Sequence, residues 1–180
     1  SKNKKIILNL EIAATNEMLK IALKYKPNYV CIVPEKRKEI TTEGGLNLKK
    51  NFNKLKSFIK KLNRNNIRTS LFINPKLSDV KLSKLTGVSC VELHTGEFCK
   101  FFNNRSKKNK MFLNIKKSVF YAKNIGLEVH AGHGLTYKTA SYISRIKNIS
   151  ELNIGHFIVS ESLFFGLNQV IKKFKNIIKK

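Results

Sequence analysis

The feature that most constrains the fold is a sixfold alternation of short apolar runs with longer helical stretches. The apolar runs are residues 6–12, 29–33, 69–73, 89–93, 127–131 and 152–159. The helical stretches that follow them are residues 16–24, 48–63, 77–85, 115–124, 139–146 and 162–179. Nearly continuous apolar strands that alternate with helices are typical of a parallel sheet covered by helices. The sequence therefore predicts an α/β fold, with residues 1–180 in a single domain.

Two architectures are built from βα units in series, an open doubly wound sheet and a barrel. No G-x-G-x-x-G motif follows the first apolar run, so the usual signature of a nucleotide-binding open sheet is absent from the sequence. Candidate polar residues instead stand at the carboxyl ends of several different runs. This distribution is typical of barrel enzymes and favours the barrel.

The net charge of +25, from 36 basic and 11 acidic residues, raises the alternative of a basic nucleic-acid-binding protein. However, 31 of the basic residues are Lys and only 5 are Arg, the residue that recognises phosphates and bases in a bidentate manner. The lysines occur in every segment together with many Asn and Ile residues, which indicates compositional drift. We expect the densest basic stretch, residues 100–117, to be a solvated helix face with apolar anchors.

The cysteines and the apolar runs bear on the cellular compartment. Cys31, Cys90 and Cys99 are an odd, sparse set, which argues against a disulfide scaffold and for a reducing compartment. No apolar run is long enough for a membrane helix, and the first is too short and too interrupted for a signal peptide. We expect a cytoplasmic protein with no membrane partner.

Candidate catalytic carboxylates occur within two of the apolar runs. Strand alternation places Glu11 on the same face as Asn9, where it is either a general base with a raised pKa or a solvated carboxylate at a strand edge. Glu92 and His94 share the segment VELHTG and face the same way. This pair could relay protons or bind a metal, or it could form an internal ion pair.

Two Gly/His turns follow the last two runs. In AGHGLT, residues 131–136, glycines on both sides of His133 allow backbone N–H groups to approach a ligand, and Gly155-His156 forms a similar turn. Loops at this position in barrels often bind phosphate, so we expect a phosphate site. We expect no metal site, because no Cys/His spacing matches a zinc motif. The charged, glycine-ended loop at residues 34–45 is either an active-site loop or a solvated connection.

Five segments together resemble the pyridoxine 5′-phosphate synthase family of vitamin B6 biosynthesis. They are residues 9–13, 33–46, 92–96, 131–137 and 151–156, and they are long and collinear. The resemblance covers essentially the whole chain. It implies a TIM-type (β/α)8 barrel, of which this chain is an incomplete portion with six βα units.

The resemblance also implies an activity. Family members condense 1-deoxy-D-xylulose 5-phosphate with 3-amino-2-oxopropyl phosphate to give pyridoxine 5′-phosphate, phosphate and water, without a metal or organic cofactor and as homo-oligomers. On this basis Glu11 is the general base, Glu92 stabilises the transition state and His133 is the proton donor. The implied substrate-binding residues are Thr41, Gly134, Gly155 and His156.

The chain departs from the family pattern at its amino-terminal end. Family members begin with two further βα units, which supply a histidine base and an arginine that binds phosphate, and this sequence opens at the family's third strand. We therefore expect the chain to be inactive alone, with a decayed, non-catalytic remnant as the alternative. A smaller departure is His130, which stands where the family usually has Asn.

Overall fold

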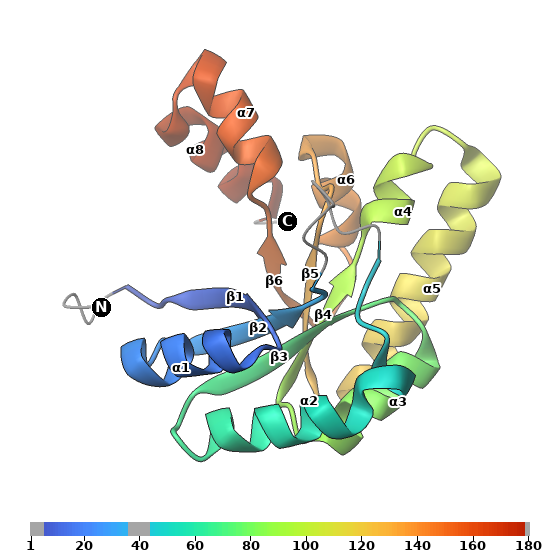
Figure 1. Ribbon diagram of the computed structural model, residues 1–180. Coiled ribbons are helices and arrows are strands. Elements are labelled where there is room, and N and C mark those ends of the chain that lie inside the picture. The colour runs from blue at the N-terminus through green and yellow to red at the C-terminus, as the bar shows by residue number, and fades with distance from the viewer. Residues whose placement is uncertain (1–5, 36–43, 179–180) are drawn as a thin grey trace.

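The computed structural model describes residues 6–35 and 44–178, in which strands and helices alternate (Figure 1). The strands are β1 (Asn9–Ala13), β2 (Tyr29–Val33), β3 (Arg68–Ile73), β4 (Cys90–His94), β5 (Glu128–Gly132) and β6 (Ile149–Asn153). The helices are α1 (Asn16–Tyr25), α2 (Leu48–Asn63), α3 (Leu77–Thr86), α4 (Gly96–Lys100), α5 (Arg105–Asn124), α6 (Tyr137–Ile143), α7 (His156–Phe165) and α8 (Leu167–Ile178).

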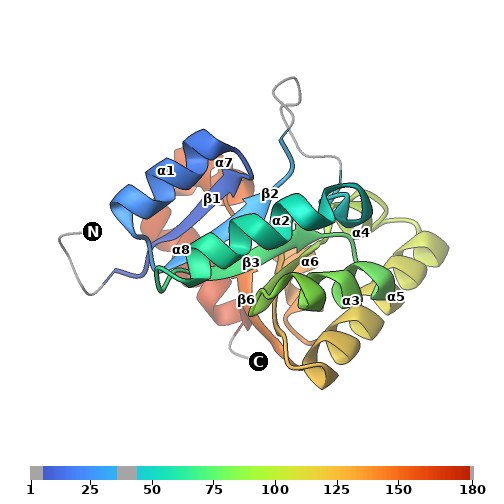
Figure 2. The same cartoon turned by 60° about the horizontal axis from the view of Figure 1, so that its bottom comes forward.

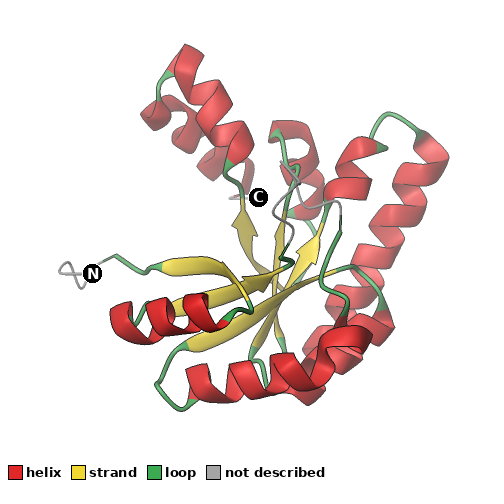
Figure 3. Cartoon of the chain, viewed as in Figure 1, coloured by secondary structure: helices red, strands yellow, loops and turns green. Residues whose placement is uncertain are grey.

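All six strands are parallel and lie in one sheet in the order of the chain, β1 to β6. The sheet curls, and its helices lie on the outside of the curve (Figure 3). Within the described residues β1 and β6 form the two edges of the sheet. Sequential parallel strands wrapped by helices are the arrangement of a (β/α)8 barrel, here represented by six βα units. The predicted fold class is confirmed.

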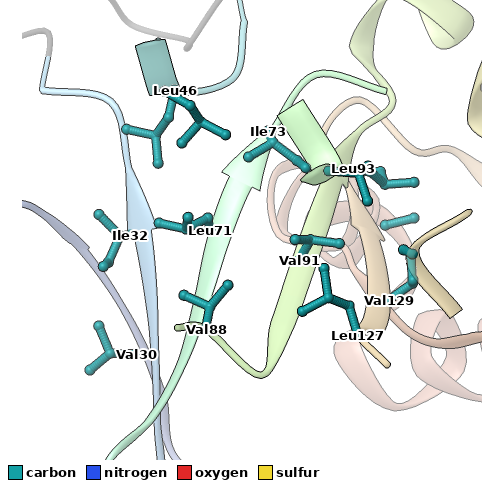
Figure 4. Close-up of a cluster of buried hydrophobic side chains, with 14 of the residues drawn as sticks. Val30, Ile32, Leu46, Leu71, Ile73, Val88, Val91, Leu93, Leu127 and Val129 are labelled. Atoms are coloured by element: carbon teal, nitrogen blue, oxygen red, sulfur yellow. The ribbon is translucent and has the colours of Figure 1, made fainter. Parts of the chain in front are cut away.

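The hydrophobic core lies between the sheet and its outer helices. Buried side chains at alternate strand positions, among them Ile32, Leu71 and Val91, share one face of the sheet (Figure 4). Helices α1, α2 and α3 cover this face (Figure 2). Helix α2 turns an apolar stripe toward the core, since Leu55, Phe58, Ile59 and Leu62 are all buried. The opposite face carries most of the polar strand residues, among them Glu11 and Glu92.

Polar residues fix where several helices begin. The Thr15 side chain accepts a hydrogen bond from the Met18 N–H at 3.2 Å, and this cap marks the start of α1. Asn47 and Asn104 cap α2 and α5 in the same way, at 3.1 and 3.0 Å. The Asn104 cap lets α5 begin at Arg105 rather than at the predicted residue 115.

The prediction for the last apolar run was wrong. Strand β6 occupies residues 149–153, whereas residues 156–159 of the predicted strand form the first turn of α7. Gly155 separates the two elements, and a short apolar run does not by itself distinguish a strand from a helix. The helix predicted at 162–179 is also divided, because Gly166 at φ 76° ends α7 before α8 begins. No described helix combines the length and apolar character needed to cross a membrane.

Candidate active site

The candidate catalytic residues gather on the polar face of the sheet, toward the carboxyl ends of the strands. Glu92 lies in β4, Asn153 ends β6, and His133 directly follows β5. Glu11 lies in the edge strand β1 and is exposed. Because all strands are parallel, their carboxyl ends meet at one rim, which is where barrel enzymes place their active sites.

Glu92 is almost fully buried, with 3% of its surface exposed. Its Oε2 accepts hydrogen bonds from the Asn153 amide at 2.6 Å and from the Cys31 thiol at 3.5 Å. Burial raises the pKa of Glu92 to about 7; the Asn153 hydrogen bond works against this shift, and the negative charge of Glu11 adds to it. A carboxyl group with this pKa can accept or release a proton at neutral pH.

Gly132 makes room for the Glu92 carboxyl group. A Cβ atom at position 132 would fall on Glu92 Oε1 and would also lie 3.1 Å from the Asn153 side chain. The glycine at the end of β5 therefore allows Glu92 of β4 to reach Asn153 of β6 across the strand between them. The first glycine of the AGHGLT segment thus serves packing inside the barrel rather than a ligand.

His133 is presented by a turn in the left-handed region, with φ at 77° for His133 and 75° for Gly134. Its imidazole is partly exposed. Burial lowers the pKa of His133, the charge of Glu11 raises it and His156 lowers it further, so both residues are close enough to act on the imidazole. Glu11 thus acts electrostatically on both Glu92 and His133, and His156 acts on His133.

His94 lies beside His133. The two ring centroids are 4.8 Å apart, and the Phe72 ring stands edge-on to His94 at 5.2 Å. His94 is 5% exposed, and its Nε2 has no hydrogen-bond partner among the described residues. Burial, together with His133, lowers the pKa of His94 to about 4, so its ring is neutral at physiological pH. The predicted common orientation of Glu92 and His94 is confirmed.

Gly155 and His156 form the start of α7 rather than the end of a strand. Gly155 is the N-cap residue and provides no side-chain cap, and both residues are exposed. Helix α6, by contrast, begins with a capping box between Thr136 and Thr139. The first N–H groups of a helix without a cap are available to an anion, and the helix dipole favours negative charge there.

Some of the site lies beyond the sequence prediction, and one predicted residue cannot be placed. Thr41 lies outside the described residues. Cys31 and Asn153, the hydrogen-bond partners of Glu92, are not among the predicted site residues. Asn153 ends β6 in the structure, but the predicted strand at 152–159 placed it near a strand start, so the signal of a carboxyl-end position was hidden. Cys31 gives no such signal, because its contact depends on the pairing of distant strands.

A second polar cluster lies toward the amino ends of the strands. Among the described residues, Cys90, Glu128 and His130 place potential metal ligands within 4.8 Å of one another. Both Glu128 oxygens are already engaged, Oε2 by Arg68, and Oε1 by His130 Nε2 and Ser150 Oγ, each at 2.9 Å. Burial favours a raised pKa for Glu128, but these hydrogen bonds lower it to about 2. We therefore interpret the cluster as an internal ion-pair network.

The basic stretch at residues 100–117 follows the predicted arrangement. It covers the end of α4 and much of α5, and its lysines are mostly exposed. Phe102, Met111 and Phe112 pack against the hydrophobic core, and the Lys107 ammonium lies 4.5 Å from the centroid of the Phe101 ring. The aromatic side chains of this stretch thus pack against the core or contact lysine side chains. The expected solvated helix face with apolar anchors is confirmed.

These features define the class of protein to which the chain belongs. Carboxyl and imidazole groups with shifted pKa values line the carboxyl-terminal rim of a parallel barrel sheet, next to a helix start suited to an anion. That combination is characteristic of a (β/α)-barrel enzyme that performs acid–base chemistry.

Comparison with known proteins identifies the family within this class. The family model described as "Pyridoxal phosphate biosynthesis protein PdxJ" matches residues 1–180, and the chain belongs to this family. A pyridoxine 5′-phosphate synthase of Pelagibacter ubique is 56% identical over 180 residues, covering 99% of this chain and 75% of the relative. The enzymes of the same name from Wolbachia pipientis and Sulfurihydrogenibium are 49% and 47% identical; the match covers 96% and 98% of this chain and 72% of each relative.

A solved structure supports the fold independently. The structure titled "Native KDPGal structure" matches with a TM-score of 0.64 over 98% of this chain and 72% of that chain. Only 8% of the aligned residues are identical. This likeness concerns the path of the backbone alone, and it places the six βα units within a larger fold of the same kind.

Proposed function

We propose that this chain forms pyridoxine 5′-phosphate by condensing 1-deoxy-D-xylulose 5-phosphate with 3-amino-2-oxopropyl phosphate. The relatives that carry the name of this activity support the proposal. The structural observation that carries it is the buried Glu92, whose pKa of about 7 is combined with a nearby imidazole, His133, at the rim of the sheet. The reaction needs such groups, because an amine adds to a ketone, water and phosphate leave, and protons move at several carbons.

The residues take separate roles in this proposal. Glu11, exposed at the rim and near His133, acts as general base. His133 donates a proton, and its lowered pKa makes the imidazolium form a stronger acid. Glu92 stabilises charge that develops in the transition state. Of these three residues, Glu11 and His133 act on each other electrostatically.

The substrates carry phosphate groups, and the rim offers a place for one of them. We propose that the N–H groups at the start of α7, with Gly134, Gly155 and His156, bind a substrate phosphate. The exposed position of Gly155 and the absence of a side-chain cap at this helix start among the described residues support this assignment. The net charge of +25 attracts such dianions over long range.

The test measures pyridoxine 5′-phosphate formation from the two substrates by liquid chromatography. The Pelagibacter ubique relative is the positive control, and the chain is assayed alone and together with the part of that relative that it does not match. We expect little turnover by the chain alone and a gain on mixing. Glu92→Gln and His133→Asn are expected to lower kcat at least about a hundredfold, whereas Glu17→Gln, on the exposed face of α1, leaves it unchanged.

Two results would count against the proposal. Absence of product from the chain, both alone and in the mixture, would overturn the activity itself. Wild-type turnover by both site variants would leave the activity in place but remove Glu92 and His133 from it.

We also propose that the chain assembles with copies of itself, as the family resemblance implies. In support, α7 exposes large apolar side chains, with Leu163 and Phe164 each 82% exposed and Phe165 56%. Exposed apolar patches of this kind commonly mark protein interfaces.

A further inference from the structure

The segment His94-Thr95-Gly96 joins the end of β4 to the start of α4 and has no role in the proposed reaction. We propose that it is a positioning element that holds His133 in its left-handed conformation at the rim. The inference rests on the proposed function, since it gives a purpose to the placement of His133. It assigns to Thr95 the role of a positioning residue rather than a catalytic one.

The backbone of His133 needs support from its surroundings. Its φ of 77° lies in a region that residues with a Cβ atom seldom adopt, and which persists only where neighbouring contacts impose it. Gly132 and Gly134 on either side add freedom to the turn rather than restraint. The restraint must therefore come from outside the turn.

Thr95 supplies that restraint. It is completely buried, and its backbone N–H donates to the Gly132 carbonyl at 2.8 Å. Its hydroxyl lies 2.8 Å from the Gly132 carbonyl oxygen and 2.7 Å from that of His133. The backbone bond continues the pairing of β4 with β5, whereas the hydroxyl reaches one residue further into the turn. The hydroxyl is therefore the group of Thr95 that contacts the backbone of His133 itself.

The two residues on either side of Thr95 complete the contact. The His94 ring lies against the His133 ring, with centroids 4.8 Å apart. A Cβ atom at position 96 would lie 2.7 Å from His94 Nε2 and 2.9 Å from His133 Cδ2. Gly96 therefore leaves the space in which the two imidazole rings lie next to each other. Each residue of the segment thus meets the His133 turn through a different group.

The test compares two substitutions at Thr95. Thr95→Ser keeps the hydroxyl and Thr95→Val removes it at nearly constant shape. Thr86→Val is the matched control, because the buried Thr86 hydroxyl also donates to a backbone carbonyl, that of Ser83 at 2.7 Å, but at the end of α3. We expect Thr95→Val to lower kcat about ten- to a hundredfold with KM changed less than about threefold, while Thr95→Ser and Thr86→Val stay within about threefold of the wild-type kcat.

A second readout separates positioning from general stability. Titration of the His133 imidazole by NMR reports its surroundings, which are Glu11 from β1, His94 from β4 and His156 from α7. None of these groups changes in the variants. Because burial lowers the pKa of His133, we expect its midpoint to rise toward the ordinary value in Thr95→Val and to stay at the wild-type value in Thr95→Ser and Thr86→Val.

The test distinguishes failure of the positioning inference from failure of the proposed function. If the wild-type protein forms no product, either alone or in the mixture with the relative's unmatched part, the activity proposal fails, and the NMR titration alone still decides the positioning inference. If Thr95→Val matches Thr95→Ser in both the titration and kcat, the inference is overturned.

If Thr95→Val does not fold, Gly96→Ala takes its place. Gly44→Ala is the control, since an added Cβ at Gly44 comes only within 3.6 Å of its nearest neighbour. An unchanged His133 titration in Gly96→Ala would then overturn it.

Discussion

The ionisable residues Glu92 and His94 have shifted pKa values, and their shifts oppose one another. Glu92 has its pKa raised from 4.5 to about 7, so the folded chain binds more protons than the unfolded chain between these values, and stability falls as pH rises. His94 has its pKa lowered from 6.5 to about 4, so the unfolded chain binds more protons, and stability rises with pH. The two contributions offset each other between pH 4.5 and 6.5.

Substitution of either residue should expose the contribution of the other. We expect the free energy of unfolding of Glu92→Gln to rise by about 2 kcal/mol between pH 4.5 and 6.5, because the His94 contribution is no longer offset. His94→Gln should show the reverse, a fall of similar size. Urea unfolding at a series of pH values measures both. Parallel pH profiles for the two variants would contradict the assigned shifts.

At this scale the sequence indicated candidate site residues but not their hydrogen-bond partners. Glu92 and His133 stand in recognisable motifs, so both could be predicted as site residues. The hydrogen bonds from Cys31 and Asn153 to Glu92 join residues 61 positions away on either side. Such contacts follow from the register of six strands, which a single sequence does not specify.

At the scale of elements, five of the six predicted apolar runs coincide with strands, and only the last one was wrong. The Thr15 cap at the start of α1 is a local interaction between neighbours in sequence. The run before α7 contains Phe157, Ile158 and Val159, which suit a strand by propensity but form a helix here. Tertiary placement decided between the two, and the strand shifted to residues 149–153.

Caps provide a prediction at this scale. Thr15→Ala should lower the free energy of unfolding by about 1 kcal/mol, because the Met18 N–H loses its partner. Lys76 is the N-cap residue of α3, has an extended backbone and makes no side-chain cap. Lys76→Ser should therefore raise the free energy of unfolding by roughly 0.5 to 1 kcal/mol. Chemical denaturation measures both changes, and a loss of stability in Lys76→Ser would contradict this account of the helix start.

At the scale of the whole molecule, two properties compete. The net charge of +25 makes copies of the chain repel one another, while the apolar side chains of α7 favour association. Salt screens the repulsion over about 10 Å at 0.1 M and leaves the apolar contribution in place. The class of fold could be predicted from the βα alternation, but the exposure of α7 could not, since its residues have a core-like composition.

This competition predicts salt-dependent assembly. Sedimentation velocity should show the average mass rising as NaCl increases from about 20 to 300 mM, because the Debye length shortens over this range. The double variant Leu163→Lys/Phe164→Lys should remain smaller at every salt concentration. As control, Lys116→Gln and Lys117→Gln on α5 lower the net charge without touching α7. Assembly of the double variant at the wild-type level would exclude α7 as the contact.

The glycine that ends β5 constrains how this protein can change over evolutionary time. Any side chain at position 132 collides with the carboxyl group of Glu92, so the two positions are not independent targets of mutation. A substitution at Gly132 becomes tolerable only after Glu92 has been shortened, and a shortened Glu92 no longer reaches Asn153. Descendants that keep the long carboxylate must keep the glycine, and the order of mutations, rather than their number, decides which variants are accessible.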